Sequence, residues 1–294
     1  MKALCFGSLN IDYTYQVDHF VARGETLLSG DLQVFSGGKG LNQSIALSRA
    51  GVETYHAGSV GEDGLFLLRQ LQEAGVDTSC VTVRDDIRTG HAIIQNSPDG
   101  DNCILLYGGA NQAITRAQVD AVLSQFTAGD VLVLQNEVSE LGYIMERAAA
   151  LGLRIALNPS PMNEKIPALP LHTVDWLLLN EVEAEQLLGY DVTDGAAAAR
   201  ELHKKLPRAA IVLTMGKAGS YYADDTQLVH QSAFPVRAVD TTAAGDTYTG
   251  YFLAGVLDGL PVQAAMALGA KAAAISVTRK GAAPSIPVRC EVTV

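Results

Sequence analysis

Short apolar runs alternate regularly with helical segments from about residue 112 onward, and this alternation constrains the fold more than any other feature. The strand-like runs are DVLVLQNE, RIALNPS, VDWLLLN and AAIVLTMG, and segments with helical spacing of apolar residues accompany them, among them 180–205. Strands that alternate with helices form a parallel sheet covered by helices on both faces. The sequence therefore predicts an α/β core, followed by helices near 245–258 and 261–277.

The first third of the chain adds further β segments to this pattern. KALCFGSLNID predicts a buried strand that ends near Gly7 and Ser8, and two regions, about 11–36 and 80–108, are rich in β-formers and turn residues. Within the second region GHAIIQN and NCILLYG flank SPDGD, which predicts a β-hairpin. The sequence contains no repeat and no low-complexity linker, so we expect a single domain over 1–294 in which these two regions form a small lid.

Composition and charge narrow the class of protein. The 294 residues carry a net charge of −11, which argues against a broad surface for nucleic acid or anionic membranes but permits an anionic ligand held by backbone N–H groups. No uncharged apolar run reaches ~18 residues, and the first residues contain too short an apolar run for a signal peptide. The widely spaced cysteines fit reduced thiols, so we expect a soluble cytoplasmic protein; they are Cys5, Cys80, Cys103 and Cys290.

Asp246 stands out in RAVDTTAAGDTYTGYFLAG, because small residues precede it and an apolar helical stretch follows it. Ala244 and Gly245 allow N–H groups at the helix start to approach a ligand, and the helix dipole strengthens such an anion site. A carboxylate there fits a base that accepts a proton from an attacking hydroxyl while the N–H groups stabilise a transferring phosphoryl group. The alternative is a helix N-cap, and one carboxylate can serve both roles.

Two N-terminal segments place polar groups next to glycines or at a strand end. SGGKGLNQS, residues 36–44, has consecutive glycines that permit close backbone approach, followed by Lys39 and Asn42 on one helix face. In SLNID, Asn10 and Asp12 point to the same side if strand geometry continues, and an amide beside a carboxylate suits several sugar hydroxyls. Neither segment is a P-loop or a dinucleotide motif. A flexible turn and an Asx-rich turn are the alternatives.

Two later segments suggest a nucleotide site. In LLLNEVEAEQLLG, Asn180 ends a strand; it either caps the next helix or joins Glu183 in organising the hydration shell of a Mg²⁺ ion. In LTMGKAGSYY, residues 213–222, two glycines lie in a turn that can approach a phosphate or a base, or else forms a plain hairpin. The histidines show no metal-ligand spacing and no Ser-His-Asp set appears, so hydrolase and zinc chemistry are weak interpretations.

The order of these motifs resembles the ribokinase-type (PfkB) carbohydrate kinase family along nearly the whole chain, and most closely its ribokinase members. GGKGLNQS resembles the N-terminal signature of that family, NEVEAE its Asn-x-x-Glu motif and VDTTAAGDTYTG its C-terminal signature. The resemblance implies a three-layer α/β sandwich with a mostly parallel central sheet and a small β lid. It also implies ATP-dependent phosphorylation of a sugar hydroxymethyl group, with ribose as the leading substrate, and a homodimer formed through the lid.

The resemblance also assigns roles to matching positions. The implied catalytic set is Ala243, Ala244, Gly245 and Asp246, with Asp246 as the base, and the implied sugar contacts are Asn10, Asp12, Gly38, Lys39, Gly40, Asn42, Glu137 and Asp246. The implied residues for ATP and Mg²⁺ are Asn180, Glu183, Thr214, Gly216, Lys217, Gly219 and Gly245. A monovalent cation, K⁺, is implied at Asp240, Thr242, Ser276, Arg279, Gly281 and Ser285, mostly through carbonyl oxygens.

Some positions depart from the family pattern and leave alternatives open. The usual Gly-Ala-Gly-Asp begins with Ala243 here, which matters if that residue needs a positive φ, and Ala270 lies near a position expected to contact adenine. The lid matches least, so another furanose, a keto sugar or a nucleoside are alternative substrates; the candidate platforms for a nucleoside base are Phe20, Tyr13, Tyr15 and Tyr107. A catalytically silent sugar- or nucleotide-binding regulator is the alternative outside enzymes.

Overall fold

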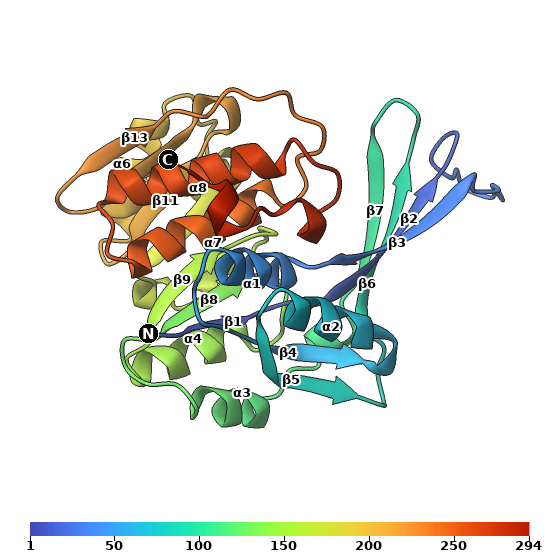
Figure 1. Cartoon of the computed structure of the whole chain (residues 1–294), viewed down its shortest axis with the longest axis horizontal. Helices are drawn as coiled ribbons and strands as arrows, with labels where there is room; N and C mark the ends of the chain where they lie inside the picture. The colour runs from blue at the N-terminus through green and yellow to red at the C-terminus, as the bar shows by residue number, and fades with distance from the viewer. Residues whose placement is uncertain (294) are drawn as a thin grey trace.

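A nine-stranded sheet forms the centre of the computed structural model, which describes residues 1–293 (Figure 1). Seven of its strands are parallel to their neighbours, and β12 and β13 add an antiparallel edge. This confirms the predicted mostly parallel sheet. In the order of the sheet, the strands are β13 (Leu228–Gln231), β12 (Ser220–Ala223), β11 (Ala210–Thr214), β10 (Trp176–Asn180), β9 (Arg154–Asn158), β8 (Val131–Gln135), β1 (Ala3–Phe6), β4 (Thr54–Gly61) and β5 (Asp77–Arg84).

Helices cover both faces of this sheet, which gives three layers (Figure 1). Side chains of a strand alternate between faces, so Leu4 and Phe6 of β1 pack in one core cluster and Ala3 and Cys5 in another. The first cluster contains the helices α3 (Arg116–Leu123), α4 (Leu141–Ala150), α5 (Glu181–Leu188) and α6 (Gly195–Lys205). On the other face lie α1 (Lys39–Arg49), α2 (Leu65–Glu73), α7 (Ala244–Leu257) and α8 (Val262–Ser276).

A separate four-stranded sheet projects from this core as a lid (Figure 1). Its strands, in order, are β3 (Asp31–Gly37), β2 (Asn10–Gln16), β6 (Gly90–Asn96) and β7 (Asn102–Tyr107). The pairing of β6 with β7 confirms the predicted hairpin. The expected lid region 80–108 was wrong at its start: residues 80–84 belong to β5, parallel to β4, because the buried Cys80 packs into the main core.

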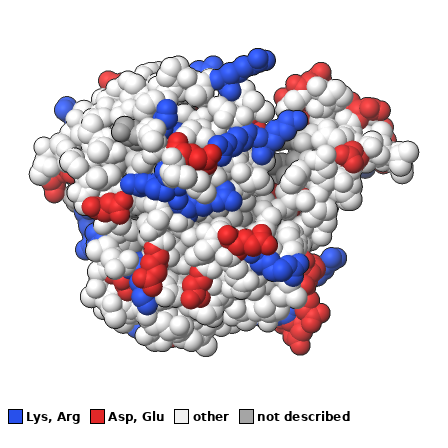
Figure 2. Space-filling view, viewed as in Figure 1, with Lys and Arg blue, Asp and Glu red and all other residues white. Residues whose placement is uncertain are grey.

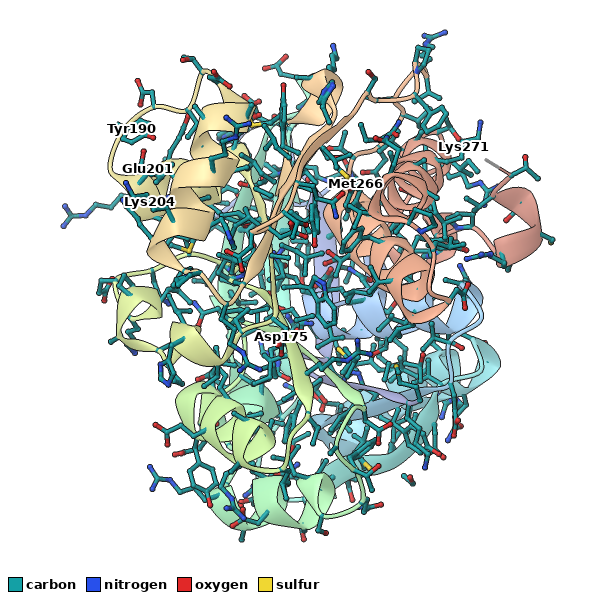
Figure 3. All side chains as sticks on the ribbon, turned by 90° about the vertical axis from the view of Figure 1, so that its left-hand side faces the viewer. Asp175, Tyr190, Glu201, Lys204, Met266 and Lys271 are labelled. Carbon is teal, nitrogen blue, oxygen red and sulfur yellow. The ribbon has the colours of Figure 1, made fainter. Side chains whose placement is uncertain are left out.

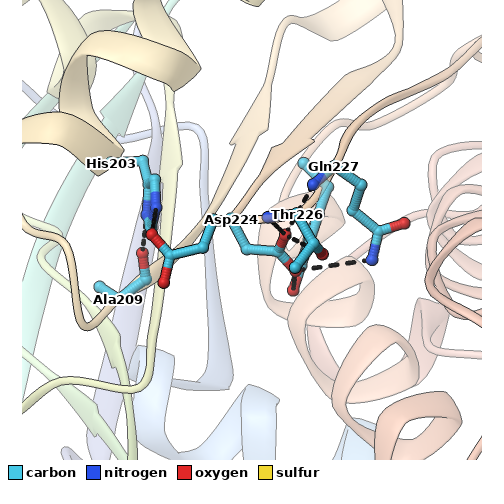
Figure 4. Close-up of polar contacts among 7 residues, drawn as sticks. His203, Ala209, Asp224, Thr226 and Gln227 are labelled. Atoms are coloured by element: carbon cyan, nitrogen blue, oxygen red, sulfur yellow. Dashed lines mark hydrogen bonds and ion pairs between the residues drawn. The ribbon is translucent and has the colours of Figure 1, made fainter.

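The edges of the core are fixed by local polar contacts away from the site. Asp224 accepts hydrogen bonds from Thr226 and Gln227 and so closes the turn between β12 and β13 (Figure 4). The Tyr190 hydroxyl donates to Glu201 across 2.7 Å, which ties the end of α5 to α6 (Figure 3). On the face shown in Figure 2 basic and acidic side chains are interspersed. Among the described residues, helices with the length and apolarity to cross a membrane are absent.

Candidate active site

Asp246 lies in the first turn of α7, and the structure shows that it is not the helix cap. The cap position is Ala243, and Asp246 is the third helical residue, so the N-cap interpretation was wrong. The Asp246 carboxylate instead faces α1: Oδ2 accepts from Asn42 Nδ2 across 3.0 Å and Oδ1 accepts from Gln43 Nε2 across 2.9 Å. Asp246 is 7% exposed, so a nearly buried carboxylate is held by one amide donor on each oxygen.

The turn before α7 presents backbone N–H groups next to this carboxylate. Ala243 has φ 60°, the left-handed conformation that turns the chain into the helix. The N–H groups of Gly245 and Asp246 have no backbone acceptor among residues 1–293, whereas Ala244 N–H donates to Thr241 O across 3.2 Å. Two free N–H groups at a helix start form an anion site. The expected third donor, Ala244, is engaged within the turn.

A cluster of polar groups lies against the start of α1, where the lid strands β2 and β3 join the core. Glu137, after β8, accepts from Lys39 N across 2.9 Å and also from the Ser8 hydroxyl. Gly38 has φ 96°, and a side chain on Gly40 would collide with the backbone of Ser8 at 2.4 Å, so these glycines let α1 begin directly against the end of β1. This arrangement places Glu137 beside Gly38, Lys39 and Gly40, which are all implied sugar contacts.

The charged groups of this cluster shift one another's pKa values. Burial raises the pKa of Asp12 to about 6, and the negative charge of Glu137 adds to the effect. Burial likewise raises the pKa of Glu137, although the positive charge of Lys39 and the Ser8 hydroxyl oppose it. For Lys39 burial alone would lower the pKa, but the charges of Asp246, Glu137 and Glu183 raise it overall. The Lys39 ammonium is thus a cation kept charged between acids.

Asn10 is oriented by a residue that the sequence analysis did not single out. Asn111, which is 2% exposed, donates to Asn10 Oδ1 across 2.7 Å and to Leu9 O across 3.2 Å, while its own Oδ1 accepts from Leu9 N. Because Oδ1 of Asn10 is occupied, the Asn10 NH₂ group is left to donate. The signal in the sequence was weak, since Asn111 follows Gly108 and Gly109 in a segment that reads as an ordinary turn.

A polar cavity of about 210 Å³ connects Asp246 with the ends of the central strands. Asn180 and Glu183 line it and form a capping box: Asn180 Oδ1 accepts from Glu183 N and Glu183 Oε2 accepts from Asn180 N. The capping interpretation of Asn180 is confirmed. The cavity also contains Asn158, which the sequence analysis did not assign, beside Lys39 and Asp246. An anion in this cavity would meet one ammonium group and the N–H groups at the start of α7.

A larger, mostly apolar cavity of about 600 Å³ lies beyond the start of α7. The β11–β12 hairpin is confirmed, and its residues Thr214, Gly216, Lys217 and Gly219 line this cavity. Ala270 of α8 lines it too. The segment 233–238 forms another part of the wall, and its Phe234 ring lies under the Lys271 ammonium at 5.0 Å; Figure 3 labels Lys271. This wall could not be predicted from the sequence, because an apolar segment without strand or helix periodicity resembles a plain loop.

Several of the residues implied for a monovalent cation lie in segments that hydrogen bonds to Asp240 hold together. Asp240 Oδ1 accepts from Thr242 N and Oγ1, and Oδ2 accepts from Gly281 N across 2.8 Å. Burial alone would raise the pKa of Asp240, but these hydrogen bonds lower it overall. The hydroxyls of Ser276 and Ser285 are buried and donate to backbone carbonyls. The Arg279 guanidinium pairs with Glu291 at 2.6 Å and, as a cation without an acceptor atom, could not hold a cation itself, so Arg279 could contribute only its backbone oxygen.

The mostly parallel sheet, the β lid and an acid at a helix start between a polar and an apolar cavity define an α/β enzyme with a lidded small-molecule site. The pfkB family carbohydrate kinase model matches residues 1–289, and the chain belongs to this family. It is 36% identical to the ribokinase of Staphylococcus aureus (strain COL) over 99% of this chain and 98% of that protein.

Solved structures lead to the same family. Arabidopsis thaliana ribokinase complexed with ribose and ATP has a TM-score of 0.90 at 29% identity and covers 99% of this chain and 97% of its own. Ribokinase from Cryptococcus neoformans var. grubii in complex with ADP has a TM-score of 0.89 at 32% identity, with 99% and 98% covered. The three-layer architecture with a β lid that the resemblance implied is confirmed.

Proposed function

We propose that this protein is an ATP-dependent ribokinase that converts ribose to ribose 5-phosphate. One observation carries the proposal: the Asp246 carboxylate and the free N–H groups of Gly245 and Asp246 lie together at the start of α7, where the two cavities share residues. The apolar cavity suits the base of a nucleotide and the polar cavity suits its phosphates. The polar cluster around Asn10, Asp12 and Glu137 suits a molecule rich in hydroxyls.

The chemistry follows from this arrangement. Asp246 accepts the proton of the sugar hydroxymethyl group, the hydroxyl oxygen bonds to the γ-phosphorus, and the bond from that phosphorus to the β–γ bridging oxygen of ATP breaks, which releases ADP. The N–H groups of Gly245 and Asp246 stabilise charge on the transferring phosphoryl group, and Lys39 adds a positive charge at the same cavity. A positioned base contributes about 10²–10⁴-fold to such a step.

The lid favours a sugar over a nucleoside. Asn10 and Asp12 alternate with Ile11 and Tyr13 along β2, so the Tyr13 ring lies on the opposite face of the lid from the polar pair. There Tyr13 packs edge-on against His91 at 5.8 Å, and His91 packs against Tyr107 at 5.0 Å. Two of the candidate base platforms, Tyr13 and Tyr107, are thus committed to one another through His91 and away from the sugar cluster.

The donor sets also suit the two cations. Glu183 brings a carboxylate to the polar cavity with only Oε2 used by the capping box, which suits a Mg²⁺ ion held through water with ATP phosphates. The loop of Asp240, Thr242 and Gly281 supplies an ionised carboxylate, as expected for a K⁺ site that braces the turn before α7. When bound, Mg²⁺ would neutralise phosphate charge and K⁺ would rigidify the turn.

A homodimer formed through the lid belongs to the same proposal. Every residue of the edge strand β7 is exposed, including Ile104, Leu105 and Leu106, and β3 adds the exposed Leu32 and Val34. An exposed apolar edge strand of this kind favours a partner strand or a cover. Light scattering is expected to give a dimer mass for the parent chain and a monomer mass for Leu105→Glu; an unchanged mass for Leu105→Glu would contradict a lid interface.

The free cysteines among residues 1–293 suit a reducing compartment, the cytoplasm.

An ADP-coupled assay over ribose, 2-deoxyribose, fructose and nucleosides, with and without K⁺, tests the proposed function. We expect the highest kcat/KM with ribose and a rise with K⁺. Preferred turnover of a nucleoside or another sugar would replace ribose as the substrate. Binding of sugar and nucleotide by calorimetry without any turnover would support the silent regulator instead, although such a protein has no need of a base at Asp246.

A further inference from the structure

Behind Asp246 lies a chain of side-chain amides that the proposed chemistry does not use. Gln43 and Gln135 are fully buried, and Gln43 Nε2 donates to Asp246 Oδ1 across 2.9 Å and to Asn158 Oδ1 across 3.2 Å. Gln43 Oε1 accepts from Gln135 Nε2 across 2.6 Å, and the Gln135 NH₂ group also reaches Cys5 Sγ at 3.5 Å. The chain joins α1, β8 and β9 to the first turn of α7.

The orientation of the Gln43 amide is set without Asp246. The backbone carbonyl of Leu178 can only accept, so Asn158 turns its NH₂ toward that oxygen, across 2.9 Å, and its Oδ1 toward Gln43. This requires the Gln43 NH₂ to face Asn158, and the Gln135 NH₂ then occupies Gln43 Oε1. A flipped Gln43 would place its oxygen against both Asn158 Oδ1 and the Asp246 carboxylate. An N–H donor is therefore aimed at Asp246 in advance.

We propose that Gln43, locked by Asn158 and Gln135, is a positioning residue that holds the Asp246 carboxylate in the orientation from which it accepts the sugar proton. The inference rests on the proposed function, because it names the residue that aligns its base. Asn42 donates to the other oxygen, Oδ2, but its own Oδ1 has no partner among residues 1–293, so no group besides Asp246 orients its amide. Gln135 Oε1 also lacks a partner there, so the polarity of Gln43 rests on Asn158 and the carbonyl of Leu178. Gln43 is thus the donor with a fixed polarity.

A displaced base is costly, since a misplacement of ~1 Å reduces rates by about 10²-fold. The Gln43→Leu variant keeps the side-chain volume and removes the donor. We expect it to keep the binding constants for ribose and ADP, by calorimetry, and to lose kcat by about 10- to 100-fold. Gln118→Leu is the matched control, because the Gln118 NH₂ also donates inside the fold, to Gly58 O and Ser59 Oγ, yet Gln118 lines neither cavity.

The decisive measurement is a double-mutant cycle with Asp246→Asn. If Gln43 acts through Asp246, Gln43→Leu should cost less than about threefold in kcat when Asp246 is already Asn. The proposal would be overturned if the kcat losses of the two single variants multiply in the double variant. A Gln43→Leu kcat within threefold of the parent would overturn it as well. If Gln43→Leu does not fold, Gln135→Leu replaces it: this variant unlocks Gln43 Oε1, and we expect a kcat loss that disappears in the Asp246→Asn background. Full kcat in Gln135→Leu would count against the proposal.

A readout independent of turnover separates this inference from the proposed function. A parent chain that phosphorylates none of the tested sugars would refute the function. Crystal structures of the parent and of Gln43→Leu would then still report on Gln43: we expect the Asp246 carboxylate to rotate away from its parent orientation. An unmoved carboxylate in Gln43→Leu would overturn the positioning role.

Discussion

The Asn111 amide donates to Asn10 Oδ1 across 2.7 Å and clamps both backbone groups of Leu9, although 101 positions separate Asn111 from Asn10. Asn111 lies just after the last lid strand and Asn10 begins the first one. One buried side chain therefore fixes the direction in which Asn10 donates and also joins the entry of the lid to its exit.

Asn111→Asp is expected to raise the KM for ribose by about 10-fold or more, because a carboxylate opposite Asn10 Oδ1 forces the Asn10 amide to flip and present an oxygen to the sugar. The kcat at saturating ribose should fall much less, since Asp246 is untouched. Steady-state kinetics check this split. The control is Asn102→Asp on the exposed face of β7, and an equal KM change in both variants would contradict the orienting role of Asn111.

Asp246→Asn should reduce kcat by about 10²–10⁴-fold, because an amide does not accept the sugar proton. The substitution keeps the size of the side chain, so ribose and ADP should bind with nearly unchanged constants in calorimetry. The exposed acid Asp258 at the far end of α7 provides the control variant Asp258→Asn. Full activity of Asp246→Asn would refute the assignment of the base.

The pKa of Asp12, about 6, predicts how sugar use depends on pH. Below pH 6 the carboxyl of the free enzyme is protonated and accepts sugar hydroxyls poorly. We expect kcat/KM for ribose to fall about tenfold per pH unit below this value, as measured in the ADP-coupled assay. Asp12→Asn should lower kcat/KM throughout and remove this inflection. Asp18→Asn, at an exposed acid just beyond β2, should keep it.

The same shift predicts an effect on stability. The pKa of Asp12 is higher in the folded protein than its ordinary value of 3.8, so the unfolded chain binds fewer protons between about pH 4 and 6. Stability is therefore lost as pH rises through that window, by about 3 kcal/mol for a shift of two units. Asp12→Asn should raise Tm at pH 8 more than at pH 4.5. A larger gain at pH 4.5 would contradict the raised pKa.

Ala243→Val should destabilise the protein by about 1–2 kcal/mol, because a β-branched side chain is strained at φ 60°. It should also lower kcat severalfold, since the turn carries the free N–H groups of Gly245 and Asp246. Urea unfolding and kcat measure the two effects, with Ala128→Val at an exposed position of negative φ as the control. Equal unfolding free energies for both variants would contradict strain at Ala243.

Patterns that local physics fixes could be predicted from the sequence. The apolar runs of β8 and β10, the hairpin of β6 and β7, and the helix cap at Asn180 depend on neighbours within a few residues, and the structure has all of them. The position of Asp246 beside the small residues Ala244 and Gly245 also indicated an anion site before any geometry was known.

Contacts between distant segments could not be predicted in this way. Gln43 and Asn111 resemble any polar residue in a helix or turn until α1 meets α7 and the lid returns to β2. The assignment of residues 80–84 to the lid failed for a related reason. The sequence of a strand does not show which sheet the strand joins, and β5 belongs to the main sheet because it pairs with β4. The cap interpretation of Asp246 failed because Ala243, not an acid, adopts the left-handed turn.

The two cavities meet at a shared wall made of Thr214, Thr241, Ala244, Gly245 and Tyr248. A single inhibitor with an aromatic heterocycle at one end and a short polyanionic, hydroxyl-bearing arm at the other would bridge this wall. Such a compound loses translational freedom once for two binding events, so its affinity should exceed that of either half by orders of magnitude. The length of its linker would measure the distance between the end of the site proposed for the nucleotide base and the end proposed for its phosphates.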